Sequence, residues 1–238
     1  MTTRTCKLCH GTGYIVSERE GALFARACSC REPDVTARLL KGASLPERYQ
    51  NRCVLGAFKP QPGTSQGEAL AVARRYAEEY PALADNRNGL MFMGPCGVGK
   101  THLAVGILLE IIYKKNLPVR FVDLNDLYRH IQSTYGRGST GENEYDIMGP
   151  LVEAPLLLVD ELGCVASPWA QDTLHFLVNQ RYNQQRPTLI TTNYPVQPEA
   201  AGDPSLENRI GTRTLSRIYE MCRMVPMDGL DYRRYKRA

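Results

Sequence analysis

The eight residues from 94 to 101 constrain this chain more than any other stretch of its sequence. They match G-x-x-x-x-G-K-[ST] and read Gly94, Pro95, Cys96, Gly97, Val98, Gly99, Lys100 and Thr101. In this pattern a glycine-rich turn between a strand and a helix points backbone N–H groups at a polyphosphate. An apolar run precedes the match and a helix-like run follows it. We therefore expect Lys100 to reach the β- and γ-phosphates of a nucleotide, and Thr101 to hold Mg²⁺ through its hydroxyl.

A second apolar run, residues 154–161, carries two acidic residues at its C-terminal end. A continuous apolar run is typical of a strand buried on both faces of a parallel sheet, and ligands bind at the carboxyl ends of such strands. We expect Asp160 to complete the Mg²⁺ site and Glu161 to polarise the water that attacks the γ-phosphate. Asn193 ends a later apolar run, where its amide can hydrogen-bond that water or the γ-phosphate.

Apolar runs, cysteine content and net charge indicate the cellular compartment and the class of partner to expect. No apolar run approaches the roughly 18 residues of a membrane span, and the first residues lack the apolar segment of a signal peptide. We therefore expect a cytoplasmic protein without membrane contact. Eight cysteines in a reducing compartment favour a metal site over a disulfide framework. The net charge of +4 permits a nucleic-acid partner without requiring one.

Four of the cysteines form two close pairs near the N-terminus, namely Cys6 with Cys9 and Cys28 with Cys30. Four thiolates are the tetrahedral set that Zn²⁺ prefers in structural sites, and two short strand-like runs lie between the pairs. The sequence predicts a small zinc-ribbon-like hairpin whose folding depends on the metal. His10 is an alternative ligand. Cys6, Cys9 and His10 also match a haem-attachment signal, but that interpretation leaves Cys28 and Cys30 without a role. A redox dithiol is a further alternative for the first pair, although no βαβ pattern surrounds it.

The order of the expected elements predicts an α/β fold with a doubly wound parallel sheet. Strands are expected at 89–93, 119–123, 154–161, 188–193 and 224–227, and helices at 34–41, 68–80, 100–115, 125–135, 168–182 and 206–221. The polar, glycine-rich stretch 136–149 is expected to be mobile or dependent on a partner. We assign 1–33 to a zinc module, 34–62 to a linker or docking segment, and 63–238 to the nucleotide-binding domain.

Together these motifs resemble the DnaC/DnaI helicase loaders and their IstB-type transposition helpers within the AAA+ ATPases. The resemblance extends from about Ser44 to Arg233. It rests on LPERY (45–49), GPCGVGKTHL (94–103), LVDELG (158–163), RY (181–182), TTN (191–193), SR (216–217) and DYR (231–233). The cysteine hairpin also resembles the N-terminal zinc module of DnaI-type loaders.

The resemblance implies roles that the spacing of residues does not show. Asn193 is similar to the sensor-1 residue, and Arg217 to an arginine finger donated to the nucleotide of a neighbouring subunit. Arg213, one turn before Arg217 on the same face, is an alternative finger. Arg233 takes the place of the sensor-2 arginine, which reads nucleotide in its own subunit. No helical lid is recognisable after it, so Arg233 is expected on a short C-terminal element.

The resemblance further implies an ATPase that loads a hexameric replicative helicase during DNA replication, with ATP and Mg²⁺ bound between the subunits of an oligomer. Turnover by an isolated monomer is then expected to be slow. The alternative is an IstB-like transposition helper or a phage-encoded ATPase that remodels a protein–DNA complex. A clamp that binds ATP without hydrolysis is a third hypothesis, against which Glu161 argues. Single-stranded DNA is a further candidate partner, with Tyr135 stacking on bases and Arg137 neutralising a phosphate.

Overall fold

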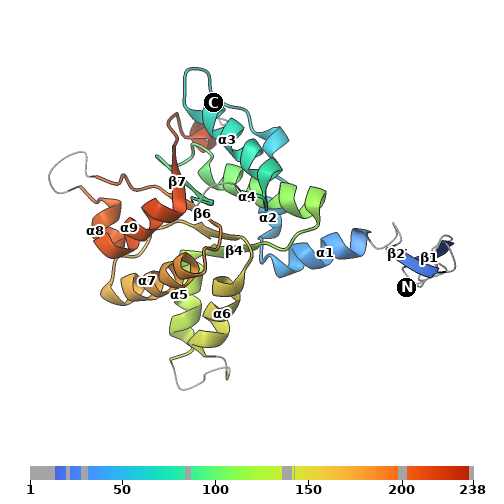
Figure 1. The fold of residues 1–238 in the computed structure, drawn as a ribbon. Coiled ribbons are helices and arrows are strands. Elements are labelled where there is room, and N and C mark those ends of the chain that lie inside the picture. The colour runs from blue at the N-terminus through green and yellow to red at the C-terminus, as the bar shows by residue number, and fades with distance from the viewer. Residues whose placement is uncertain are drawn as a thin grey trace.

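The computed structural model describes residues 14–19, 22–27, 32–83, 87–135, 141, 143–197 and 203–235. Its core is a five-stranded sheet in the order β4-β5-β6-β3-β7 (Figure 1). The strands are β3 (Gly89–Met93), β4 (Arg120–Asp123), β5 (Leu157–Asp160), β6 (Thr188–Thr192) and β7 (Cys222–Pro226). All neighbouring strands run parallel, which confirms the predicted sheet.

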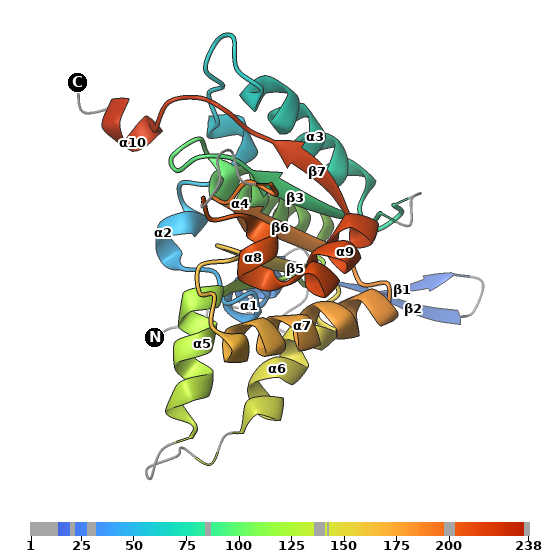
Figure 2. The ribbon, with the colours of Figure 1, turned by 90° about the vertical axis from the view of Figure 1, so that its left-hand side faces the viewer.

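Helices cover both faces of this sheet, as Figures 1 and 2 show. The helices of one face are α3 (Gln66–Glu79) and α4 (Lys100–Glu110), which a π-helical turn at Ile111–Lys115 extends. The helices of the other face are α5 (Leu124–Ser133), α6 (Glu144–Glu153), α7 (Pro168–Asn183), α8 (Leu206–Ile210) and α9 (Thr212–Met221). This arrangement buries both faces of the strands, which explains their continuous apolar sequences.

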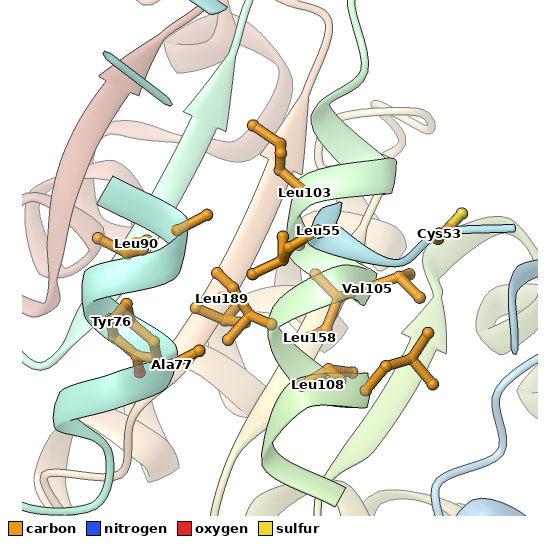
Figure 3. Packing of buried hydrophobic residues seen from close by; sticks show 14 of the residues in the cluster. Cys53, Leu55, Tyr76, Ala77, Leu90, Leu103, Val105, Leu108, Leu158 and Leu189 are labelled. Atoms are coloured by element: carbon orange, nitrogen blue, oxygen red, sulfur yellow. The ribbon is translucent and has the colours of Figure 1, made fainter. Parts of the chain in front are cut away.

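Side chains of the central strands alternate between two cores. Leu90 and Leu158 belong to the core beneath α3 and α4, whereas Met91 and Val159 belong to the core beneath the opposite helices. Figure 3 shows the first core, where Leu103 and Leu108 of α4 lie among the strand leucines. The period of two follows from the pleat of the strands.

The segment before α3 also contributes to the first core. It contains α1 (Glu32–Gly42), α2 (Glu47–Gln50) and a 3₁₀ turn at Leu55–Ala57. Leu45 and Leu55 are buried there, and a Cβ added to Gly106 of α4 would lie 2.5 Å from Cδ2 of Leu55. Part of the stretch predicted as a linker therefore packs directly against α4.

Two sequence-based expectations about helices are wrong. The list of expected helices contains none between residues 135 and 168, but α6 begins at Glu144, inside the stretch 136–149. The Asn143 side chain accepts hydrogen bonds from the N–H groups of Tyr145 and Asp146, and the Asp146 carboxylate accepts one from the Asn143 N–H. This capping box starts a helix that Gly149 and Pro150 conceal in the sequence. The single helix expected at 206–221 is instead two helices, α8 and α9, separated at Gly211, whose φ is 81°.

The N-terminal strands β1 (Tyr14–Arg19) and β2 (Ala22–Ala27) pair antiparallel in a sheet of their own. Cys6, Cys9, Cys28 and Cys30, predicted to bind zinc, and the alternative ligand His10 lie outside the described residues. The zinc site therefore stays a prediction. Within the described parts of the chain, no helix combines the length and apolar character needed to cross a bilayer.

Candidate functional site

The loop between β3 and α4 adopts a conformation that depends on its glycines. Gly94 and Gly97 have φ angles of 148° and 79°, in a region that other residues rarely adopt. A Cβ at Gly94 would lie 1.8 Å from the carbonyl oxygen of Met227, and a Cβ at Gly97 would lie 1.8 Å from Oδ1 of Asp231. The chain that follows β7 therefore packs directly on this loop.

That C-terminal segment crosses the loop on its way to α10 (Tyr232–Tyr235), as Figure 2 shows. The Tyr232 N–H donates to the Gly97 carbonyl at 3.1 Å. The Gln61 side chain accepts from the N–H of Leu230 at 2.9 Å and donates to its carbonyl at 3.0 Å. These contacts place Arg233 beside the loop.

Lys100 is a buried cation at the centre of the loop. Its Nζ donates to the carbonyl oxygens of Gly94 and Pro95 at 2.7 and 2.6 Å. Burial lowers the pKa of Lys100 to about 8, because few polar groups replace the water that the ammonium loses. A buried ammonium inside a glycine-rich cradle is the arrangement that a polyphosphate anion would neutralise.

Thr101 and Asp160 meet beside this lysine. The Thr101 hydroxyl donates to Oδ1 of Asp160 at 2.9 Å, and the Thr191 hydroxyl donates to the same oxygen at 2.5 Å. Burial raises the pKa of Asp160, and the two hydroxyl donors partly offset that rise. The adjoining hydroxyl and carboxylate are hard oxygen ligands of the kind that Mg²⁺ takes. Among the described residues, no group of three or more His, Cys, Asp or Glu side chains could hold a metal ion by itself. Mg²⁺ does not require such a group, because it keeps several waters and binds the substrate's phosphates.

Glu161 leaves β5 with a φ of 61°, a left-handed backbone that costs a non-glycine residue about 1 kcal/mol or more. Its N–H donates to the Thr191 hydroxyl at 3.1 Å, and its Oε2 accepts from Nδ2 of Asn125 at 2.9 Å. Burial and the nearby carboxylates of Asp123 and Asp160 raise the pKa of Glu161. A carboxylate held in this way is suited to accept a proton from water.

One cavity of about 280 Å³ gathers most of the predicted site. Its walls include the phosphate loop from Cys96 to Thr101, together with Glu161, Asn193 and Arg233. Tyr49 and Phe58 contribute aromatic side chains to the same cavity. Gly94, Pro95 and Asp160 act from behind this surface, through Lys100 and Thr101. The residues fit a nucleoside triphosphate, because the cavity combines a glycine cradle, a buried cation and a carboxylate.

Arg217 lies apart from that cavity, on α9. Its Nη1 donates to the Arg213 carbonyl at 3.3 Å, its guanidinium lies 5.8 Å from the centre of the Tyr182 ring, and its buried Nε has no hydrogen-bond partner within the described structure. Arg213 is exposed one turn away. Neither arginine is among the residues that line the cavity of its own subunit, and the finger assignment stays a prediction.

Sequence reasoning missed three residues that support the site. Thr191 bridges Asp160 and Glu161, Asn125 holds the Glu161 carboxylate, and Arg209 contacts the loop that follows Glu161. Thr191 belongs to the TTN motif and lies near the carboxyl end of the buried strand β6, so its hydroxyl at that edge of the sheet was a usable signal. Asn125 and Arg209 become visible only when the ends of different elements meet in space.

The surface near Tyr135 has an acidic character. The Tyr135 hydroxyl donates to Oε2 of Glu144 at 2.7 Å, and its ring packs edge-on against Trp169 with centroids 6.4 Å apart. Asp172 lies beside the same aromatic hollow. Arg137, the predicted phosphate contact, lies outside the described residues. The described part of this surface therefore offers rings for stacking without a cation for phosphate.

Comparison with known proteins places this geometry in a family. Residues 74–238 match the family of IstB-like ATP binding proteins. The replicative helicase loader DnaC of Escherichia coli K12 is 30% identical over 129 residues, which cover 54% of this chain and 50% of DnaC. The insertion sequence IS232 putative ATP-binding protein of Bacillus thuringiensis is 28% identical over 207 residues, covering 85% of this chain and 75% of that protein.

Solved structures agree with these sequence matches. A crystal structure of the DnaC helicase loader is 31% identical, with a TM-score of 0.64 over 77% of this chain and 100% of that chain. The alignment nonetheless spans only about half the length of the curated DnaC relatives. The phosphate loop, the parallel sheet and these matches lead to one conclusion: the chain belongs to the IstB-like ATP-binding family, the AAA+ ATPases that include DnaC-type helicase loaders and insertion-sequence ATP-binding proteins.

Proposed function

We propose that this protein hydrolyses ATP at sites shared between neighbouring subunits. The observation that carries the proposal is the buried Lys100, whose hydrogen-bond partners among the described residues are two loop carbonyls. It lies beside the Thr101–Asp160 pair and Glu161. Burial without an ion pair to any described carboxylate suits this cation to bind phosphate. Family membership supports the same activity.

Each residue of the cavity then has a distinct task. Lys100 and the loop N–H groups bind and orient the phosphates, while Glu161, held by Asn125, accepts a proton from the attacking water. Asn193 orients that water or the γ-phosphate. Thr101 and Asp160 would hold Mg²⁺, which when bound would supply positive charge to neutralise the phosphates.

Two arginines would stabilise the negative charge that develops on the phosphoryl oxygens in the transition state. Arg233 belongs to the same subunit and reaches the cavity through the C-terminal segment. Arg217, or Arg213 on the same helix, would come from the neighbouring subunit. A guanidinium suits both tasks because it is permanently charged and presents a planar fork to phosphoryl oxygens.

We further propose that the ATPase loads a hexameric replicative helicase, with residues 1–33 as a zinc module that docks on it. Support comes from the 31% identity to the DnaC structure over the whole of that chain. The second candidate is a transposition helper, favoured by the longer match to the IS232 protein. Affinity capture with a purified hexameric helicase and, separately, a transposase separates the two. Elemental analysis that finds no zinc would exclude the zinc module.

Replacement of Lys100 tests the ATPase proposal. Lys100→Ala should weaken ATP binding by on the order of 100-fold, because charge-assisted bonds to phosphate are lost from a buried site. Lys114→Ala is the matched control, since Lys114 pairs with Glu110 on the surface of the adjoining helical turn. Equilibrium binding of a fluorescent ATP analogue gives the affinity. Unchanged binding and turnover in Lys100→Ala would contradict the proposal.

A further inference from the structure

Arg209 of α8 connects three parts of the molecule. Its Nε donates to the Gly163 carbonyl and its Nη2 to the Cys164 carbonyl, the latter at 3.0 Å. Its guanidinium carbon lies 4.2 Å from the centre of the Tyr194 ring. A half-buried arginine thus holds two carbonyls with its fork and an aromatic ring with its face.

The two carbonyls belong to the turn that begins at Glu161, in which the Cys164 N–H donates to the Glu161 carbonyl. That turn is also tied to β6, because the Leu162 N–H donates to the Thr191 carbonyl at 2.8 Å and the Thr192 hydroxyl donates to the Leu162 carbonyl at 2.9 Å. A Cβ at Gly163 would lie 3.1 Å from both Leu206 and Tyr194, so the turn fits closely against α8. Movement of α8 would therefore move the turn after Glu161.

The ring contacted by Arg209 follows the other predicted catalytic residue. Tyr194 comes directly after Asn193, which lines the nucleotide cavity. The Leu206 N–H donates to the Pro195 carbonyl at 2.7 Å, so the start of α8 is bound to the same strand end. Arg209 consequently contacts the segments carrying both Glu161 and Asn193.

The opposite end of α8 leads to the predicted finger. Gly211 alone separates α8 from α9, which carries Arg213 and Arg217. Nε2 of Gln171 donates to the carbonyls of Asn208 and Arg209 at 3.2 and 3.1 Å, which fixes the end of α8 against α7. The short helix α8 therefore lies between the turn after Glu161 and helix α9, whose arginines are predicted to reach the next subunit.

We infer that Arg209 is a positioning residue that couples Glu161 and Asn193 of its own subunit to the finger helix presented to the neighbouring subunit. The inference rests on the proposed shared-site ATPase. Its chemistry requires arginine, because a lysine ammonium cannot bind two carbonyls as a planar fork while stacking on Tyr194.

The test compares Arg209→Ala and Arg209→Lys with Arg223→Ala, a control that removes an exposed arginine from β7. Both Arg209 variants should lower kcat by roughly 10- to 100-fold, because small misplacements of catalytic groups have effects of that size. Their affinity for the ATP analogue should stay within about threefold of wild type, since Arg209 does not line the cavity. A kcat equal to that of Arg223→Ala, or a loss confined to ATP affinity, would overturn the inference.

Hydrogen–deuterium exchange gives a readout that does not depend on turnover. In Arg209→Ala, faster exchange is expected in peptides spanning 161–165 and 212–221, with the rest of the sheet unchanged. Faster exchange in only one of the two peptides, or throughout the chain, would refute the coupling. If the wild-type protein shows no ATP hydrolysis, the proposed function fails, and the exchange experiment still decides the role of Arg209.

Discussion

Arg181 of α7 and Arg217 of α9 differ in how many hydrogen bonds their side chains make. Arg181 of α7 is 1% exposed and donates to five oxygens. These oxygens are the carbonyls of Leu151, Val152, Ala154 and Pro187 and the hydroxyl of Thr188. Arg217 of α9 has one carbonyl of its own helix, a ring at 5.8 Å and an Nε without a partner in the described structure.

The difference separates a structural arginine from one available for function. Every guanidinium nitrogen of Arg181 has at least one acceptor, and in this sense the fork is saturated: it holds the end of α6 and the start of β6 and leaves no nitrogen free for a further ligand. Burial lowers its pKa to about 9, which still leaves it charged at neutral pH. The Arg217 guanidinium makes one hydrogen bond within the described structure, to a carbonyl of α9, so it keeps donor capacity that a phosphate from another subunit could use if the side chain turned outward.

The largest effect should come from removing the available arginine. Arg217→Ala should reduce the kcat of the assembled protein by about 10³-fold or more, the range known for arginine fingers. Its free energy of unfolding should change by less than about 1 kcal/mol, because few of its contacts contribute to the fold. Steady-state ATPase assays and urea denaturation measure the two quantities. Arg213→Ala is the matched variant, and a larger loss there would reassign the finger to Arg213.

Removing the saturated arginine should have the opposite pattern. Arg181→Met should lower the free energy of unfolding by about 3–5 kcal/mol, because several buried oxygens lose their donor. Arg217→Met is the control and should differ little from wild type in urea denaturation. A loss below about 1 kcal/mol in Arg181→Met would show that saturation of donors does not identify structural arginines in this fold.

The smallest effect should come from the ring beneath Arg217. Tyr182 donates from its hydroxyl to Oε2 of Glu220 at 2.6 Å, an exposed pair, so Tyr182→Phe should change stability by about 0.5 kcal/mol or less. Tyr182→Ala also removes the ring and should alter kcat more than Tyr182→Phe does, if the ring orients the finger. Equal kcat values for the two variants would exclude an orienting role for Tyr182.

The sequence was sufficient for the sheet and for naming most of the residues that the fold gathers around one cavity, because both depend on short local patterns. The phosphate loop specifies its own strand and helix, and the apolar run before Asp160 specifies a buried parallel strand. Helix α6 was missed because Gly149 and Pro150 argue against a helix in the sequence, whereas in the structure the Asn143 cap starts one. The break at Gly211 was missed because the apolar residues of 206–221 follow a helical period on both sides of it. The contacts of Arg181 and Arg209 join carbonyls from distant segments, and backbone acceptors leave no trace in the residue pattern.

The central claim, that each ATP site is completed by a neighbouring subunit, is tested most directly by mixing two inactive variants. Lys100→Ala lacks a working nucleotide site but retains its finger, whereas Arg217→Ala retains the site and lacks the finger. Head-to-tail assembly from an equal mixture should restore about a quarter of wild-type ATPase activity, because about one in four interfaces pairs an intact site with an intact finger. A mixture as inactive as its separate components, at concentrations where the wild type assembles and turns over ATP, would contradict the claim.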